Sequence, residues 1–449
     1  MEKNNTLLYG SITKGLISFA IPYLFSCFLQ TFYGMADLMI VGMFEKASST
    51  AAVAIGSQFM HMVTVIIVGF AMGVTIHIGH CIGANKKVEI HETIGTTIVL
   101  FGLISLGLTL LLFLLTKPIC IVLQTPIEAL DSTIQYLQTC FMGIPLIVAY
   151  NIISAIFRGL GDSKRPMYFV AIACGINLIL DYFFIGTLHL SSFGAALATI
   201  LGQGVSVLIS LIMMKRLNLG VRISIRDIRW NRLLNKKILD VGTPIAFQDG
   251  LIQVSFLIIT MIANSRGLIA SSSVGIVEKI ISFFFLVPSA FLSTISTMTA
   301  QNMGAHQKER AVQGLFTGMG IACLWGISIA LFCQIFAPNI VGLFTKDFQV
   351  IQAGSEYLRS YVFDTFFASI HFCFSGYFCG IHKSGLSFIH NIISIFTIRI
   401  PGAYFASVWW PQTLYPMGWA PGLGSLLSGI LCFYFYKKEK STNMKIESK

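Results

Sequence analysis

Four polar side chains recur along one otherwise apolar stretch, residues 21–42. They occupy positions i, i+4, i+7 and i+11, so a helix would place all of them on one face. They are Ser26, Gln30, Tyr33 and Asp37. A carboxylate on an apolar helix is costly in contact with lipid. We therefore expect this face to line a polar site.

Two later segments carry polar pairs with helical spacing. Asn177 and Asp181 are four residues apart, as are Thr199 and Gln203. If Asp37 and Asp181 lie close together, low polarity and mutual repulsion favour neutralisation by a proton or a small cation. Carboxylate, amide and hydroxyl oxygens would hold such an ion, which is the chemistry of a coupling site. The alternative is that hydrogen bonds between helices satisfy both carboxylates.

A second ionisable set lies in the second half of the chain. Asp249, Asp364 and Arg399 each fall near the middle of an apolar segment. Asp364 and Arg399 are on consecutive segments, so we expect an ion pair; structural pairing and substrate contact both remain open. For Asp249, which has no obvious partner, a role in binding substrate or cation is favoured.

The elements that carry these residues are membrane-spanning helices. Of 449 residues, 55% are hydrophobic and only 11% are charged, and the mean hydropathy is +0.78. A soluble domain is about a quarter charged, and about 20 apolar residues span a bilayer as a helix. Twelve such runs are predicted: 15–41, 51–79, 94–115, 131–156, 167–187, 194–214, 238–263, 274–300, 314–337, 354–380, 387–409 and 415–436.

Basic residues predict the orientation of these helices. Most of the Lys and Arg residues fall in the termini and the even-numbered loops, with the densest group at residues 215–237. The positive-inside rule then places both termini and this loop in the cytoplasm, in a multi-pass protein of the cell membrane. The net charge of +11 reflects this topology and contact with membrane lipids, and nucleic-acid binding is disfavoured.

Cysteine and histidine give no metal or disulfide pattern in the sequence. The ten cysteines are scattered singly through apolar segments, so we interpret them as packing residues. The membrane histidines are interpreted as hydrogen-bonded packing residues rather than proton relays: His61, His77, His371 and His390.

The chain contains an internal duplication at an offset of 221 residues. Gly83-Ala84 aligns with Gly304-Ala305, and Tyr136-Leu137 aligns with Tyr357-Leu358. Six helices per half give both halves the same orientation, a parallel repeat associated with transporters rather than enzymes. We expect an amino-terminal lobe (1–214), a basic cytoplasmic linker (215–237) and a carboxy-terminal lobe (238–449) around a central cleft.

The polar residues are not duplicated. Because the shared fold needs only what both halves share, we expect these residues to serve function. Asp37 aligns with Ile258 or Ile259, and Asp181 aligns with Gly402. Asn177 and Asn151 likewise align with apolar residues in the second half. The first lobe is therefore expected to hold the ion site. Asp37 and Asp181 should lie at similar depth, and Asn151 nearer the cytoplasmic side.

The ordered motifs resemble the multidrug and toxic compound extrusion (MATE) family over essentially the whole chain. The motifs are PYLFSCFLQTFYGMADLMIVG, AVAIG, GAN, FRGLGDSKRP, GINLILDYFFIG, VGTPIAFQ, SVGIVEKI, AQNMGAH and GYFCGIHKSG. The resemblance implies an all-α fold of twelve helices in two lobes. It also implies export of amphipathic organic compounds, often cations, against inward H⁺ or Na⁺ flow.

The resemblance also implies a set of site residues. The amino-lobe cation site of family members maps onto Asp37, Tyr33, Asn151, Asn177, Asp181 and Thr199. Of these, Asp37, Asn177 and Asp181 would hold Na⁺ if sodium is the coupling ion. Pro22 matches the proline at which the first helix is thought to bend. The carboxy-lobe cation site of another branch fits poorly, because its glutamate falls near Ile252 or Gln253 and Asp364 is about one turn from its aspartate.

Other functions remain as alternatives. A lipid-linked oligosaccharide flippase would favour a cationic cleft, whereas the mid-membrane charges are mostly acidic. A membrane-embedded transferase would need a His/Asp or carboxylate set at an interface loop, and none stands out. We expect a bacterial, monomeric exporter with no cofactor besides the transported ion. Gln30, Gln203, Asp249, Asp364 and Arg399 are candidates for substrate contact or gating.

Overall fold

The computed structural model describes residues 6–216 and 228–447. The described chain is almost entirely helical, and eleven of its helices are long and apolar enough to cross a membrane. The pair Ile127–Met142 and Ile144–Gly159, bent by 49°, supplies a twelfth span. The predicted all-helical membrane fold is confirmed, and each predicted run falls on one of these spans.

The chain divides into two compact units, each described separately below. Unit 1 contains Ile21–Ala246 and unit 2 contains Thr6–Ala20 and Phe247–Lys449. The division falls inside two long helices, close to Pro22 and Pro244. The predicted linker, residues 215–237, lies partly outside the described residues, and its described end, Arg232–Lys237, begins a helix of unit 1.

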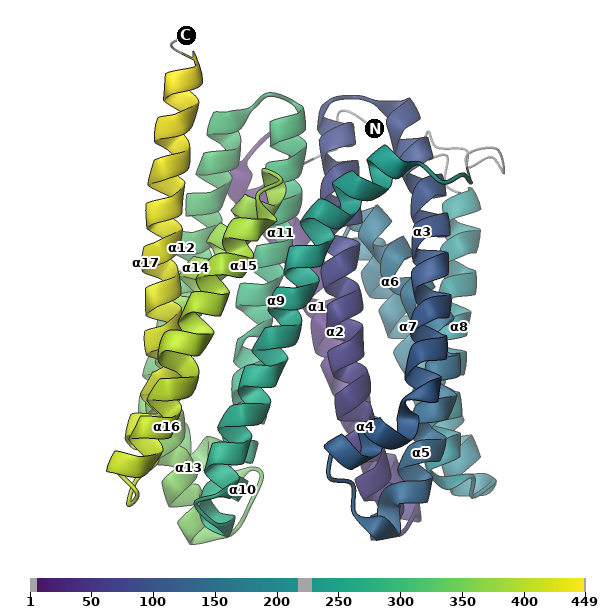
Figure 1. The fold of residues 1–449 in the computed structure, drawn as a ribbon, viewed down its shortest axis with the longest axis vertical. Coiled ribbons are helices and arrows are strands. Elements are labelled where there is room, and N and C mark those ends of the chain that lie inside the picture. The colour runs from purple at the N-terminus through teal and green to yellow at the C-terminus, as the bar shows by residue number, and fades with distance from the viewer. Residues whose placement is uncertain (1–5, 217–227, 448–449) are drawn as a thin grey trace. The chain divides into compact units, whose positions relative to one another are not determined.

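Unit 1 contains most of the first repeat (Figure 1). It begins with the part of α1 (Ile12–Phe44) that follows residue 20 and ends with the first part of α9 (Arg232–Asn264). Between them lie α2 (Ala47–Gly83), α3 (Lys87–Leu114), α4 (Thr116–Val122), α5 (Ile127–Met142), α6 (Ile144–Gly159), α7 (Lys164–Asp181), the π-helix η2 (Tyr182–Thr187) and α8 (Ser191–Arg216). Helix α2 packs against α5 and α6, and α7 packs against α8.

Unit 2 contains the second repeat and the start of α1. Its helices are the remainder of α9, α10 (Leu268–Phe284), α11 (Leu286–Gly304), α12 (Lys308–Gly342), α13 (Phe348–Tyr361), α14 (Phe363–Gly380), α15 (Ser384–Ser394), the π-helix η4 (Ile395–Arg399), α16 (Ile400–Trp409) and α17 (Tyr415–Glu447). Helix α14 packs against α11, α12 and α17, so it lies at the centre of this unit.

The backbone repeats the duplication seen in the sequence. Asn85 and His306, which align in the repeat, both adopt left-handed conformations, with φ of 56° and 59°. Each of them follows the end of a long helix, where a left-handed residue turns the chain. The GAN and GAH motifs are therefore helix-ending turns.

Close helix contacts are duplicated as well. A Cβ on Gly159 of α6 would lie 2.7 Å from the Thr75 carbonyl oxygen of α2. A Cβ on the aligned Gly380 of α14 would lie 2.5 Å from the Thr299 side chain of α11. Only glycine fits where two helix backbones approach this closely. The shared glycines thus serve the fold, which leaves the residues that differ between repeats for function.

Candidate functional site

The polar face of α1 contains two buried residues and two that are more open. Asp37 is 4% exposed and Ser26 is 5% exposed. Tyr33 is half-buried and Gln30 is exposed. The Ser26 hydroxyl donates to the Pro22 carbonyl at 3.0 Å, so Ser26 is engaged within α1 itself. Asp37 is thus the residue of the predicted face that is both buried and free to bind an ion.

Asp37 and Asp181 are brought together from α1 and the end of α7. Both are buried, Asp181 completely, and the two carboxylates interact electrostatically. The Thr199 hydroxyl of α8 contacts Asp37 Oδ2 at 3.5 Å. Among the ion pairs of the described residues, none includes either aspartate. The structure thus places two unpaired acids side by side.

Several buried polar atoms around this pair lack a hydrogen-bond partner among the described residues. They are Asp37 Oδ1, both carboxylate oxygens of Asp181, both amide atoms of Asn177, and Gln203 Oε1. Leaving a buried polar atom unsatisfied costs about 1–3 kcal/mol, and an unpaired buried charge costs more. Such a set of oxygens in one place is what a proton or a small cation would satisfy.

A small cavity lies against this set. Its volume is about 20 Å³, which is room for about one water molecule or small cation. Its polar lining comes from Gln30, Tyr33, Tyr150, Asn177, Thr199 and Gln203. An organic substrate would need several hundred cubic ångströms, so this cavity suits the coupling ion rather than the exported compound.

Helix geometry changes beside Asp181. Helix α7 ends at this residue and the π-helix η2 begins at Tyr182. A π-helical segment shifts the side chains that follow it and is frequent at functional sites. The second repeat has a π-helix in its corresponding span, η4, which ends at Arg399. Each repeat therefore has a π-helix next to a buried ionisable residue.

Asn151 and Pro22 are placed differently from the acidic pair. The Asn151 side chain is buried, and its Nδ2 donates to the Ile147 carbonyl at 2.8 Å within α6. Its membership of the ion site stays a prediction. Pro22 lies inside α1, which runs as one helix from Ile12 to Phe44, and the bend at this residue stays a prediction.

Unit 2 contains a separate cluster around Arg399. The guanidinium lies over the Phe256 ring, 4.5 Å from its centroid, and Nη2 donates to the Tyr361 hydroxyl at 3.5 Å. Asp364 is completely buried, yet neither carboxylate oxygen has a hydrogen-bond partner among the described residues. The predicted direct ion pair between Asp364 and Arg399 is therefore not formed. The aromatic and phenol contacts occupy the guanidinium instead, and Asp364 interacts with it only at longer range.

Glu278 of α10 joins this cluster, which the sequence did not indicate. Its Oε2 accepts a hydrogen bond from Thr260 at 3.0 Å, and its Oε1 is buried without a partner among the described residues. It interacts electrostatically with Arg399. Only the tertiary packing reveals the inward direction of its side chain.

Asp249 and His390 of unit 2 have local partners, whereas Nδ1 of His371 is buried without a hydrogen-bond partner among the described residues. Asp249 is half-buried and interacts with the neighbouring Gln248, whose Oε1 accepts from the Ser387 hydroxyl at 2.6 Å. His390 contacts the hydroxyl of Ser375 at 3.0 Å, as expected of a packing histidine. Asp249 lies apart from the Arg399 cluster in these contacts, and its role stays a prediction.

A known family model matches both halves of the chain. The MatE family model matches residues 22–183 and again residues 244–405. Two matches at this spacing agree with the duplication seen in the sequence, and together they cover most of the chain.

Individual relatives match along most of their length. A probable multidrug resistance protein, YpnP of Bacillus subtilis, is 27% identical over 438 residues, 97% of both chains. A probable multidrug resistance protein, NorM of Thermotoga maritima, is 26% identical, covering 88% of this chain and 85% of its own. The solved outward-facing structure of a multidrug resistance MATE family transporter has a TM-score of 0.91 at 23% identity, covering 99% of each chain.

Proposed function

The chain belongs to the MatE family, the family it resembles in sequence, and from this we propose that it is a secondary active multidrug exporter. It exports amphipathic organic compounds, often cations, in exchange for inward H⁺ or Na⁺. Relatives named as multidrug resistance proteins along nearly the full chain support the transport class. The ion-coupling part rests on the acidic site of unit 1.

The pair Asp37 and Asp181 carries the proposal of ion coupling. Two buried carboxylates that repel each other bind a proton or a cation more tightly than either would alone. Asn177, Thr199 and Tyr33 supply the further oxygens around the pair. These are hard oxygen ligands, which suit Na⁺ and leave a shared proton equally possible. When bound, the ion removes the repulsion between the two acids.

The site communicates with α1 through Asp37. In the ion-free state the charge of Asp37 favours any arrangement that brings its Oδ1 toward water or another donor. In the ion-bound state the carboxylate is neutralised and can stay buried. Pro22 removes one backbone hydrogen bond from α1, so we propose that α1 bends there between the two states.

The proposed topology follows from the basic residues. Both termini lie in the cytoplasm, and the protein crosses the cell membrane of a bacterium. Coupling ions then enter from outside down their electrochemical gradient. One charge moving across about 100 mV supplies about 2.3 kcal/mol, which corresponds to a gradient of about fifty-fold in substrate concentration.

Efflux from proteoliposomes under separate ion gradients tests this function. The purified protein is reconstituted, loaded with a fluorescent organic cation, and given a proton gradient or a sodium gradient alone. We expect one of the two gradients to accelerate efflux at least tenfold over no gradient. Asp37→Asn should lose this acceleration while still binding the dye.

An exposed carboxylate provides the control. Asp131 of α5 is exposed and outside the site, so Asp131→Asn should keep the wild-type response. Efflux that neither gradient accelerates in the wild-type protein would refute ion coupling. Full gradient-driven efflux by Asp37→Asn would refute the assigned site.

A further inference from the structure

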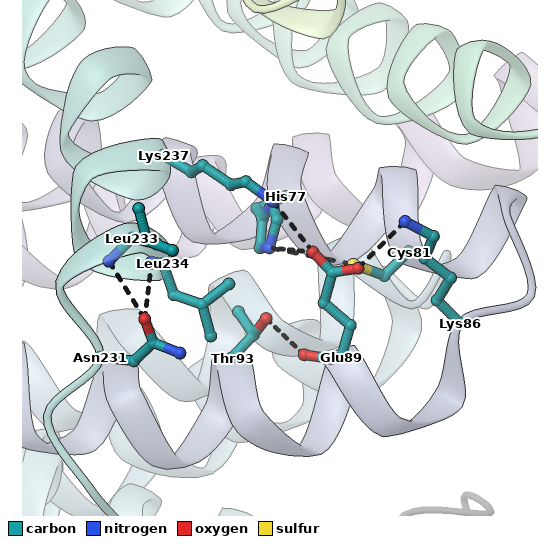
Figure 2. A network of polar contacts seen from close by, with 9 residues as sticks. All are labelled: His77, Cys81, Lys86, Glu89, Thr93, Asn231, Leu233, Leu234 and Lys237. Atoms are coloured by element: carbon teal, nitrogen blue, oxygen red, sulfur yellow. Dashed lines mark hydrogen bonds and ion pairs between the residues drawn. The ribbon is translucent and has the colours of Figure 1, made fainter.

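A cluster of metal-binding side chains lies where α2 meets α3, outside the acidic site (Figure 2). His77 and Cys81 are four residues apart on α2, so they share one helix face. Glu89 enters from the first turn of α3. The sequence placed no metal site here, because Glu89 reaches the other two only through the turn at residues 84–86.

The three ligand atoms are arranged closely enough for one ion. His77 Nε2 lies 3.9 Å from Cys81 Sγ and 3.6 Å from Glu89 Oε1, and all three atoms lie within 4.8 Å of one another. Bonds of about 2.0–2.3 Å in a tetrahedral zinc site place ligand atoms roughly 3.3–3.8 Å apart. A small movement of the Glu89 carboxylate would complete three corners of such a site.

Burial and access also fit a bound ion. His77 is 4% exposed and Cys81 is 3% exposed, whereas the Glu89 side chain is 22% exposed. Glu89 also lines an open groove of about 600 Å³, together with Lys86, Glu92, Asn231 and Lys237. An ion could enter from the groove through Glu89 and find the two buried ligands behind it.

The aligned positions of the second repeat show that the fold does not require these residues. At the 221-residue offset, His77, Cys81 and Glu89 align with Met298, Asn302 and Arg310. There Asn302 Nδ2 donates to the Leu7 carbonyl at 3.1 Å, and Arg310 Nη1 donates to the Gly10 carbonyl at 3.0 Å. In the second repeat, side chains at two of these positions thus donate hydrogen bonds to backbone carbonyls near the amino terminus. In the first repeat, the three positions bring a nitrogen, a sulfur and an oxygen ligand together.

We propose that His77, Cys81 and Glu89 form a binding site for a divalent transition-metal cation of the zinc class. Imidazole and thiolate favour such metals over Mg²⁺ or Ca²⁺. Cys81 gives up its thiol proton to solvent when the metal binds. The metal then faces one thiolate, one carboxylate and a neutral imidazole, and its fourth position is open to water from the groove.

Two lysines compete with the metal for Glu89. Lys237 Nζ lies 3.1 Å from Glu89 Oε1, and Lys86 Nζ lies 3.3 Å from Oε2, as Figure 2 shows. Metal binding takes Oε1 away from Lys237, which lies in the part of α9 that belongs to unit 1. The ion would therefore loosen the contact between α3 and α9, giving the site a way to regulate transport.

Cobalt absorption of the full-length protein tests this site. The protein is purified in detergent with an affinity tag that contains no histidine, and Co²⁺ is added alone or in competition with Zn²⁺. We expect one Co²⁺ per chain with a thiolate-to-cobalt charge-transfer band, which Zn²⁺ abolishes. Cys81→Ser should abolish the band, and His77→Gln and Glu89→Gln should weaken Co²⁺ binding at least tenfold.

Two control variants outside the site, and one variant expected to bind Co²⁺ more tightly, complete the test. Cys120→Ser and His189→Gln remove the same atom types elsewhere in unit 1 and should bind Co²⁺ as the wild type does. Lys237→Gln removes the competing ammonium and should tighten binding severalfold, which a misfolded protein would not do. A wild-type protein without the band, a band that survives Cys81→Ser, or unchanged affinity in Lys237→Gln would each overturn the proposal.

Discussion

At the scale of single residues, the acidic sites of units 1 and 2 differ in what neutralises their buried carboxylates. In unit 1, Asp37 and Asp181 contact each other and neutral oxygens, and neither forms an ion pair with another described residue. The proposed coupling ion would neutralise them. In unit 2, Asp364 and Glu278 lie near the permanent charge of Arg399. A resident guanidinium leaves less reason to bind a coupling ion. This difference supports the proposal that the coupling site lies in unit 1.

Because Asp37 and Asp181 are proposed to share one ion, their substitutions should not add. Asp37→Asn and Asp181→Asn should each abolish gradient-driven efflux, and the double variant should be no worse than either single variant. Each substitution removes a repulsive buried charge, so the free energy of unfolding should stay equal or rise by about 1–3 kcal/mol. Thermal unfolding in detergent and proteoliposome efflux measure both quantities. Additive losses of transport would show that the two acids act at separate sites.

Arg399 should be a major stabilising residue of unit 2. Arg399→Met leaves the buried Asp364 and the half-buried Glu278 without the cation that both interact with, which should lower the free energy of unfolding by about 3–5 kcal/mol. Adding Glu278→Gln to Arg399→Met should restore part of this loss, because one uncompensated charge is removed. Thermal unfolding of the single and double variants provides the measurement. Equal stability of Arg399→Met and the wild type would contradict the role assigned to the guanidinium.

At the scale of helices, hydropathy predicted which segments span the membrane but not where they break. The predicted run 131–156 is two helices bent at Gly143, and the run 274–300 is broken at Phe285. Apolar composition is the same on both sides of such a break, so a hydropathy window averages across it. The helices also extend past the apolar core, as α1 does from Ile12 to Phe44.

The ion site was easier to predict from the sequence than the two clusters that contain Glu278 and Glu89. Asp37 and Asp181 stand out in sequence because their aligned positions in the second repeat are apolar. Glu278 and Glu89 did not stand out, because each lies near the end of a predicted apolar run, where charges are common. Their inward direction depends on the packing of neighbouring helices, such as α10 against α13, and spacing along one helix does not contain that information.

Pro22 gives a prediction for helix α1. Pro22→Ala restores a backbone N–H and lets α1 form an uninterrupted hydrogen-bond ladder, which should stiffen the helix. We expect efflux to fall at least tenfold while binding of the fluorescent cation changes less than threefold. Pro338 lies inside α12 of unit 2, a helix that supplies no residue of the ion site, so Pro338→Ala is the matched control. Wild-type efflux by Pro22→Ala would contradict a bend at this proline.

At the scale of the whole molecule, the duplication separates what folds the chain from what couples it to ions. Both repeats keep the glycines at close helix contacts and the left-handed residues that end helices. Only the first repeat has an acidic pair without a resident cation among the described residues. From this single site we propose that one coupling ion enters in each transport cycle.

A single coupling charge makes the effect of membrane potential depend on the substrate. Exchange of one entering monovalent ion for one leaving monovalent cation moves no net charge, so its rate should be nearly independent of potential. Export of an uncharged substrate moves one charge inward. An inside-negative potential of about 100 mV should then raise its steady gradient by up to about fifty-fold.

Proteoliposomes with a potassium diffusion potential set by valinomycin measure this dependence. The ion gradient is held constant while efflux of a monovalent cationic dye and of an uncharged dye is followed at several potentials. Asp37→Asn provides the control, because its residual efflux of either dye should not respond to the ion gradient. Strong acceleration of the monovalent dye by an inside-negative potential would require more than one coupling charge per cycle. That result would place a second coupling ion outside the acidic pair, with the half-buried Asp249 of unit 2 the first residue to test.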